Sequence, residues 1–175
     1  GQPCPVAISF GQDPLLFVIS ALAIPPGVSE YGIAGAVRGE PVEVIKGVVT
    51  GLPLPAQAEI VIEGLSFPSE SRLEGPFGEF SGYYASREKA EPFVKVKRVL
   101  YRNNPIITGA PPFRPPSDTT LFRSLGSSAM VWDNLERAGV PDVRGVWQHE
   151  AAHWAFTVVS IKQRYPGHAR QAGLL

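Results

Sequence analysis

The sequence predicts an α+β fold that is mainly β, with a β-barrel-like unit over residues 1–118 and the beginning of an α/β domain over residues 119–175. Three observations predict this division. Glycine and proline number 18 each, which suits strands joined by rigid turns better than a helical bundle. Apolar and polar residues alternate in segments 58–63 and 93–101, as they do in half-buried strands. A long stretch with helical spacing, residues 119–138, follows.

The first elements are predicted from the residues that bound them. Residues 6–10 are expected to form a short buried strand. Asp13 and Pro14 predict a helix start, because a capping carboxylate followed by proline suits the first turn, and the apolar residues 15–23 continue this helix. Residues 27–35 are expected to form a loop or a short helix.

The next segments favour strands. Residues 42–49 are rich in valine, which suits a strand. In segment 58–63 the alternation puts Ile60 and Ile62 on one face of the strand. The other face carries Glu59, Val61 and Glu63.

Two connectors and a hairpin are predicted in the rest of the chain. Residues 65–90 are rich in glycine, proline and serine and predict a long loop, and loops of this length are usually functional or disordered. Residues 105–116 form a second proline-rich connector. Residues 143–147 and 156–161 are predicted strands joined by a short hairpin loop.

Composition and charge argue against several classes of protein. Lys and Arg together number 16, as do Asp and Glu, so no imbalance of charge points to nucleic acid or to an anionic membrane. No apolar run reaches the roughly 20 residues that span a bilayer. The single cysteine, Cys4, cannot form an internal disulfide, which favours a cytoplasmic location. The chain does not begin with Met and stops at Leu175 inside a predicted helix, so we expect a piece of a longer protein.

One loop motif suggests acid–base chemistry. The sequence Glu74-Gly75-Pro76-Phe77-Gly78-Glu79 holds two carboxylates five residues apart in a loop stiffened by glycine and proline. Such a loop can place two carboxylates in different environments, so that one stays ionised and one carries a proton. The alternative is a solvated turn with two surface glutamates.

Several motifs resemble one family in the same order along the chain. The strings "EGPFGEFSGYY" and "YRNNPI" look like the central region of the UbiD-like decarboxylases. The upstream strings "PVAISFGQDP", "IPPGVSEYGIAGAVRGEPVEVIK" and "LPLPAQAEIVIEG" resemble the same family, as does the downstream "VVSIKQRYPGHARQA". The resemblance implies a split β-barrel, similar to flavin-binding barrels, over residues 1–118. It also implies a reversible non-oxidative decarboxylase or carboxylase acting on aromatic, heteroaromatic or α,β-unsaturated acids through a prenylated FMN adduct.

The resemblance also implies roles for residues of the loop motif. Glu79 matches the proton donor and acceptor at the carbon that loses CO2, and Glu74 matches the glutamate that holds a catalytic Arg. Phe80 would line the substrate pocket. The family's catalytic Arg, with an Asn and a His of the metal site, would precede residue 1, so we expect this chain to be inactive by itself.

Further positions match the family's cofactor site. Glu30 matches a carboxylate that binds the Mn²⁺ or Mg²⁺ ion clamping the cofactor phosphate, which is suitable chemistry for a hard cation. Ser20, Ala21 and Leu22 match a turn that approaches the cofactor and a monovalent cation such as K⁺, with Ser20 among the metal-binding positions. Lys162 matches a lysine near the cofactor, where a point charge suits a phosphate. The family further implies a flavin prenyltransferase as cofactor supplier and a homo-oligomer.

Two other functions stay open at this point. The first is a non-catalytic homologue that only binds flavin or serves as an assembly scaffold. The second is a zinc hydrolase, because His149-Glu150-Ala151-Ala152-His153 satisfies the H-E-x-x-H pattern. That chemistry needs a helix with both imidazoles on one face, whereas the flanking strands predict a hairpin loop here.

Overall fold

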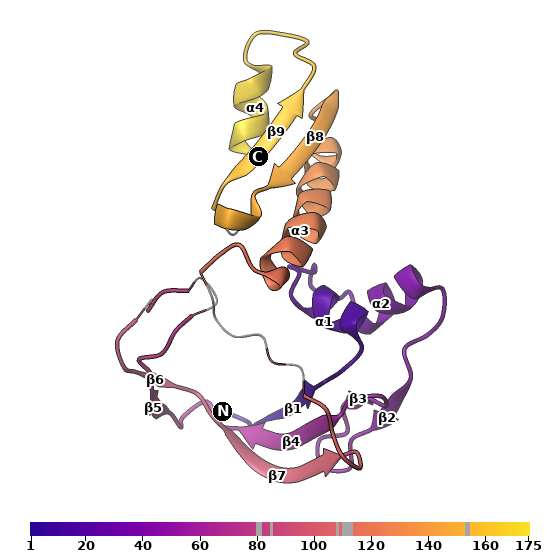
Figure 1. The fold of residues 1–175 in the computed structure, drawn as a ribbon, viewed down its shortest axis with the longest axis vertical. Helices are drawn as coiled ribbons and strands as arrows, with labels where there is room; N and C mark the ends of the chain where they lie inside the picture. The colour runs from indigo at the N-terminus through magenta and orange to yellow at the C-terminus, as the bar shows by residue number, and fades with distance from the viewer. Residues whose placement is uncertain (80–81, 85, 108, 110–113, 153–154) are drawn as a thin grey trace. The chain divides into compact units, whose positions relative to one another are not determined.

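A computed structural model describes residues 1–79, 82–84, 86–107, 109, 114–152 and 155–175. The fold mixes helices with small antiparallel sheets (Figure 1). The chain divides into two compact units, each described by itself below. The N-terminal unit comprises Gly1–Ser20, Ile24–Glu79 and Tyr83–Pro111, and the C-terminal unit comprises Ala21–Ala23, Phe80–Gly82 and Pro112–Leu175.

A three-stranded antiparallel sheet forms the centre of the N-terminal unit. Its order is β1 (Cys4–Phe10), β4 (Ile60–Ser66) and β7 (Val94–Tyr101). All three strands were predicted, β4 and β7 from alternation and β1 as a short buried strand, although the residues of β1 are exposed or half-buried. A bulge follows Glu63 on β4, where Gly64 is required because a Cβ atom there would lie 2.6 Å from the carbonyl oxygen of Lys95.

Only one face of this sheet is covered within the described residues. Leu54, Ala58 and Val61 form a buried cluster there. The opposite face presents large apolar side chains to solvent, namely Ile8, Phe10, Val99 and Tyr101. The sheet is therefore apolar on both faces. This pattern is typical of strands whose two faces are both buried.

Two helices pack together beside the sheet in the N-terminal unit (Figure 1). In α1 (Pro14–Ser20) the predicted cap is confirmed, because the Oδ1 atom of Asp13 accepts hydrogen bonds from the amides of Leu15 at 2.9 Å and Leu16 at 3.3 Å. The other carboxylate oxygen of Asp13 pairs at 2.5 Å with Arg38 of α2 (Glu30–Arg38). The predicted helix 15–23 thus stops early, at Ser20, and the 27–35 segment is confirmed as a short helix.

The remaining strands of this unit are three residues long. They form two antiparallel pairs, β2 (Val44–Lys46) with β3 (Pro53–Pro55), and β5 (Arg72–Glu74) with β6 (Lys89–Glu91). The prediction of one uninterrupted loop over 65–90 was wrong, because three-residue strands are too short to show alternation in the sequence. Among the described residues these pairs are separate sheets that do not close into a barrel, so the split barrel stays a prediction.

A buried carboxylate fixes the turn between β2 and β3. The side chain of Glu63 is fully buried, and its Oε1 atom accepts hydrogen bonds from the amides of Val49 at 3.1 Å and Thr50 at 3.0 Å and from the Thr50 hydroxyl at 2.8 Å. Burial would raise the pKa of Glu63, but hydrogen bonds from Thr50 and Val49 hold that pKa below its usual value. Gly47 completes the turn, since a Cβ atom there would lie 2.3 Å from Oε1.

The C-terminal unit packs helices on a β-hairpin (Figure 1). The predicted long helix is confirmed as α3 (Asp118–Arg137), which starts with a capping box between Ser117 and Thr120. The predicted strands are confirmed as β8 (Val143–Gln148) and β9 (Thr157–Ile161), with the short 3₁₀ helix η1 (Glu150–Ala152) between them and α4 (His168–Leu174) after them. The buried core is made by Leu135, Val140, Val143 and Ala172.

Within the part of the chain that the structure describes, no helix combines the length and apolar character needed to cross a membrane.

Candidate active site

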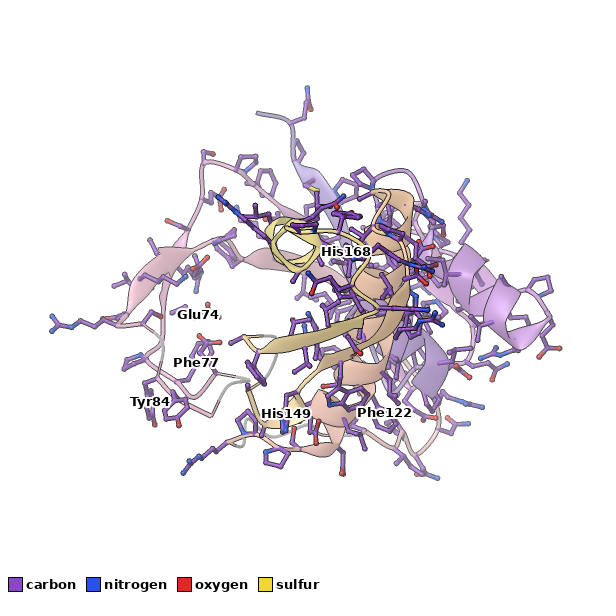
Figure 2. The ribbon with its side chains drawn as sticks, turned by 90° about the horizontal axis from the view of Figure 1, so that it is seen from above. Glu74, Phe77, Tyr84, Phe122, His149 and His168 are labelled. Carbon is purple, nitrogen blue, oxygen red and sulfur yellow. The ribbon has the colours of Figure 1, made fainter. Side chains whose placement is uncertain are left out.

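The two glutamates of the loop motif lie at the start of the β5–β6 connection. Glu74 is the last residue of β5 and pairs with Lys89 of β6, so the two side chains emerge on the same face of the hairpin. Figure 2 shows Glu74 on this loop with Phe77 and Tyr84. Glu79 is half-buried, and its amide donates a hydrogen bond to the carbonyl oxygen of Tyr83 at 2.9 Å. The sequence therefore places an exposed and a half-buried carboxylate in one loop.

Lys89 connects the two glutamates electrostatically. A hydrogen bond to Glu91 and the charge of that residue raise the pKa of Lys89. The charges of Glu79 and Glu74 add to this increase. Both carboxylates of the motif therefore lie near one cation, whose ion-pair partner is Glu91.

A hollow borders the same loop. It has a volume of about 590 Å³ and is lined by Pro76, Tyr84, Ser86, Arg87 and Glu88. The Tyr84 side chain is 74% exposed, so its ring is presented to solvent. Phe80, the predicted substrate-pocket residue, lies outside the described residues. Arg87, which also lines the hollow, was not predicted, because no motif or spacing in the sequence marks it.

The predicted metal and cofactor residues come from two different units. Glu30 is the first residue of α2 and is exposed, and Ser20 ends α1 with its hydroxyl donating to the carbonyl oxygen of Phe17 at 2.8 Å. Ala21 and Leu22 belong to the C-terminal unit, so the structure does not place them relative to Glu30. There Leu22 packs against Gly126 of α3, where a Cβ atom would lie 2.7 Å from it.

The described residues contain no group of three or more His, Cys, Asp or Glu side chains that could hold a metal ion. Glu30 is nevertheless an exposed carboxylate with no ion pair among the described residues. Mg²⁺ is commonly bound through one or two carboxylates together with phosphate oxygens and water. Glu30 is therefore suited to supply one carboxylate ligand to such an ion.

Lys162 lies in a cluster of cations around one carboxylate in the C-terminal unit. Its amide donates to the carbonyl oxygen of Asp142 at 3.0 Å. The hydrogen bond from Arg164 holds the pKa of Asp142 below its usual value, and the charges of Arg144 and Lys162 act in the same direction. Three cations thus surround one anion, an excess of positive charge that suits a phosphate group.

The described part of the H-E-x-x-H segment, residues 149–152, does not form the α-helix of a zinc protease. His149 precedes the three-residue η1, and its Nδ1 atom accepts a hydrogen bond from the amide of Ala151 at 3.2 Å. The segment connects two strands of a hairpin, as predicted, and a 3₁₀ turn does not align residues four apart as an α-helix does. Figure 2 shows His149 on this connection, whereas His153 lies outside the described residues.

Comparison with known families shows which family the chain belongs to. The family model described as the 3-octaprenyl-4-hydroxybenzoate carboxy-lyase Rift-related domain matches residues 1–115. The chain belongs to the UbiD family. The model of the UbiD C-terminal domain matches residues 120–175, so the two matches follow each other along the chain.

Solved structures of UbiD-class enzymes have the same fold. An evolved dimeric form of HmfF from Pelotomaculum thermopropionicum, in complex with prFMN, is 32% identical with a TM-score of 0.86, over 98% of this chain and 40% of that one. The closed form of vanillic acid decarboxylase from Sedimentibacter hydroxybenzoicus is 30% identical with a TM-score of 0.89, over 99% and 36%. The 3,4-dihydroxybenzoic acid decarboxylase AroY from Klebsiella pneumoniae is 32% identical with a TM-score of 0.78, over 99% and 38%. The chain thus spans less than half the length of these relatives.

Proposed function

We propose that this chain is the central part of a reversible, non-oxidative UbiD-class decarboxylase that acts on aromatic, heteroaromatic or α,β-unsaturated carboxylic acids with prenylated FMN. The observation that carries the proposal is the β5–β6 loop, which places the exposed Glu74 opposite Lys89 and holds the half-buried Glu79 five residues later. Membership of the UbiD family and the likeness to a prFMN complex support the cofactor and the reaction type.

The two glutamates would have different tasks because their surroundings differ. Glu79 is half-buried and matches the family's proton donor, so it would protonate the substrate carbon after CO2 leaves. Glu74 is exposed and at the end of a strand, where it can hold a cationic partner such as the family's Arg. Phe80 would line the substrate pocket. When bound, the prenylated flavin supplies the electron sink for the charge left on the substrate.

The residues that match the family's cofactor site would hold the cofactor. Glu30 would bind Mn²⁺ or Mg²⁺ at the cofactor phosphate, and Lys162 would add a positive charge. Ser20, Ala21 and Leu22 would form the turn beside the cofactor and a K⁺ ion. The division at residue 118 into a cofactor-binding domain and a C-terminal α/β domain is part of the same proposal.

The uncovered face of the β1–β4–β7 sheet supports the split barrel. Exposed Ile8, Phe10, Val99 and Tyr101 would be buried by further strands in the complete enzyme. An apolar surface of this kind is rarely left in water. The exposed, free thiol of Cys4 suits a reducing compartment such as the cytoplasm, and we expect a homo-oligomer supplied with cofactor by a flavin prenyltransferase.

The test is the absorption spectrum of the full-length protein after co-expression with a flavin prenyltransferase. We expect a bound modified flavin whose retention depends on Mn²⁺ or Mg²⁺ and falls in Glu30→Ala. The matched control is Glu40→Ala, which removes another exposed glutamate close to the end of α2. A folded, colourless protein would instead support a scaffolding homologue.

A further inference from the structure

The first turn of α2 carries Glu30 but has little local restraint. Ser29 occupies the N-cap position without making a side-chain cap hydrogen bond. Glu30 itself is exposed, so packing does not fix its side chain. A carboxylate ligand needs a fixed backbone to keep its oxygen atoms in place, and outer-shell hydrogen bonds usually provide this.

The next residue, Tyr31, ties this turn to the sheet layer. Its ring packs against the buried cluster of Leu16, Ile19 and Ala34 between the two helices. Its hydroxyl donates a hydrogen bond to the carbonyl oxygen of Pro53 on β3 at 3.2 Å. This contact joins residues 22 positions apart in the sequence, and it connects the start of α2 to a different element.

The acceptor of this hydrogen bond is itself held firmly. The amide of Gly47 donates to the carbonyl oxygen of Leu52 at 2.8 Å, immediately before Pro53. The turn between these two residues is the one bound by the buried carboxylate of Glu63. A chain of contacts therefore runs from the central strand β4 through this turn and Pro53 to Tyr31.

Packing alone does not fix the Tyr31 ring on the side of the sheet. On that side the ring borders a hollow of about 220 Å³, whose lining includes Ser9, Leu52 and Val61. The hydroxyl hydrogen bond to Pro53 is therefore the contact that ties Tyr31 to β3, in addition to the packing of its ring on the helix cluster.

We propose that Tyr31 is the positioning residue for Glu30. Its hydrogen bond to Pro53 sets where α2 begins, and this fixes the carboxylate that would bind the divalent cation. Tyr31 acts through Glu30 and touches neither the cation nor the substrate. The inference rests on the metal role given to Glu30 under the proposed function, and it adds a residue for which the sequence motif gave no role.

The test measures Mn²⁺ binding to the full-length protein. Free Mn²⁺ is detected by its electron paramagnetic resonance signal. Loss of one hydrogen bond should weaken Mn²⁺ binding about two- to tenfold in Tyr31→Phe. Glu30→Ala should weaken it far more. The matched control is Tyr101→Phe, the same change at a tyrosine of β7 whose hydroxyl makes no hydrogen bond among the described residues. Thermal melting of each variant shows whether it is folded at the temperature of the titration.

The outcomes separate the two ideas. Weaker Mn²⁺ binding in Tyr31→Phe, with the protein fully folded and Tyr101→Phe unchanged, supports the positioning role. Wild-type Mn²⁺ binding in Tyr31→Phe, together with its loss in Glu30→Ala, overturns the role of Tyr31 and leaves the metal role of Glu30 intact. Unchanged binding in Glu30→Ala overturns both. If cooling refolds Tyr31→Phe and restores its Mn²⁺ binding at the same temperatures, the weaker binding reflects unfolding. That result also overturns the positioning role.

Discussion

Two connections of the N-terminal unit join pairs of three-residue strands, yet they differ in what their carboxylates do. In the β2–β3 turn the carboxylate of Glu63 comes from the central strand, is fully buried and accepts hydrogen bonds from Val49 and Thr50. In the β5–β6 loop Glu74 is exposed and Glu79 half-buried, and both act on Lys89.

The difference shows how to distinguish a carboxylate that stabilises the fold from one that is available for binding or catalysis. The Oε1 atom of Glu63 accepts three hydrogen bonds from the β2–β3 turn, whereas Oε2 is buried without a partner among the described residues. The hydrogen bonds lower the pKa of Glu63, so the side chain stays ionised and holds the turn. The glutamates of the β5–β6 loop have no such set of donors among the described residues, which leaves them free to bind a partner or to exchange a proton. Buried and satisfied groups stabilise a fold, whereas accessible groups near a cation are available for chemistry.

The largest expected effect is on catalysis, through Glu79→Gln. Glutamine cannot donate a carboxyl proton, so solvent deuterium exchange into the product and turnover should fall by about 10²- to 10⁴-fold. Flavin content should stay at the wild-type level. The control is Glu70→Gln, a surface glutamate before β5 that pairs with Lys95 at 2.6 Å. Turnover within twofold of wild type in Glu79→Gln would remove Glu79 from the mechanism.

The next largest effect is on stability, through Glu63→Ala. This change leaves the amides of Val49 and Thr50 without their acceptor, and each unsatisfied buried group costs about 1–3 kcal/mol. Urea denaturation should therefore show a loss of at least about 2 kcal/mol in the free energy of unfolding. Glu79→Ala, the matched change in the other connection, should alter it by no more than about 0.5 kcal/mol. Equal losses in both variants would contradict the contrast between the two connections.

The smallest effect is on the pH dependence of stability. The pKa of Glu63 is lower in the folded protein than its ordinary value of 4.5, so its ionised form stabilises the fold. This contribution is fully present above the unfolded pKa and is lost as the pH falls through the lower, folded pKa. Unfolding measured from pH 7 to pH 3 should therefore show a smaller acid destabilisation in Glu63→Ala than in the wild type. Parallel curves for the two proteins would show that Glu63 does not contribute.

The sequence predicted the long elements and the family. Alternation identified β4 and β7, a short apolar segment identified β1, and helical spacing identified α3. These features depend on neighbours a few residues apart, so the sequence alone shows them. The order of the motifs identified the UbiD family, and the predicted hairpin around His149 was confirmed. The residue roles in the site remain proposals.

Only the tertiary structure decided which contacts the polar residues make. Alternation in 58–63 separated Ile60 and Ile62 from Val61 and Glu63 but did not show that the face with Glu63 is the buried one. Burial of that carboxylate is favourable only because a turn 13 residues away supplies its hydrogen-bond donors. The strands β5 and β6 and the contact of Tyr31 with Pro53 likewise depend on segments that meet only in the folded chain. Local patterns determine elements, whereas the state of a buried or accessible charge depends on distant partners that the sequence does not display.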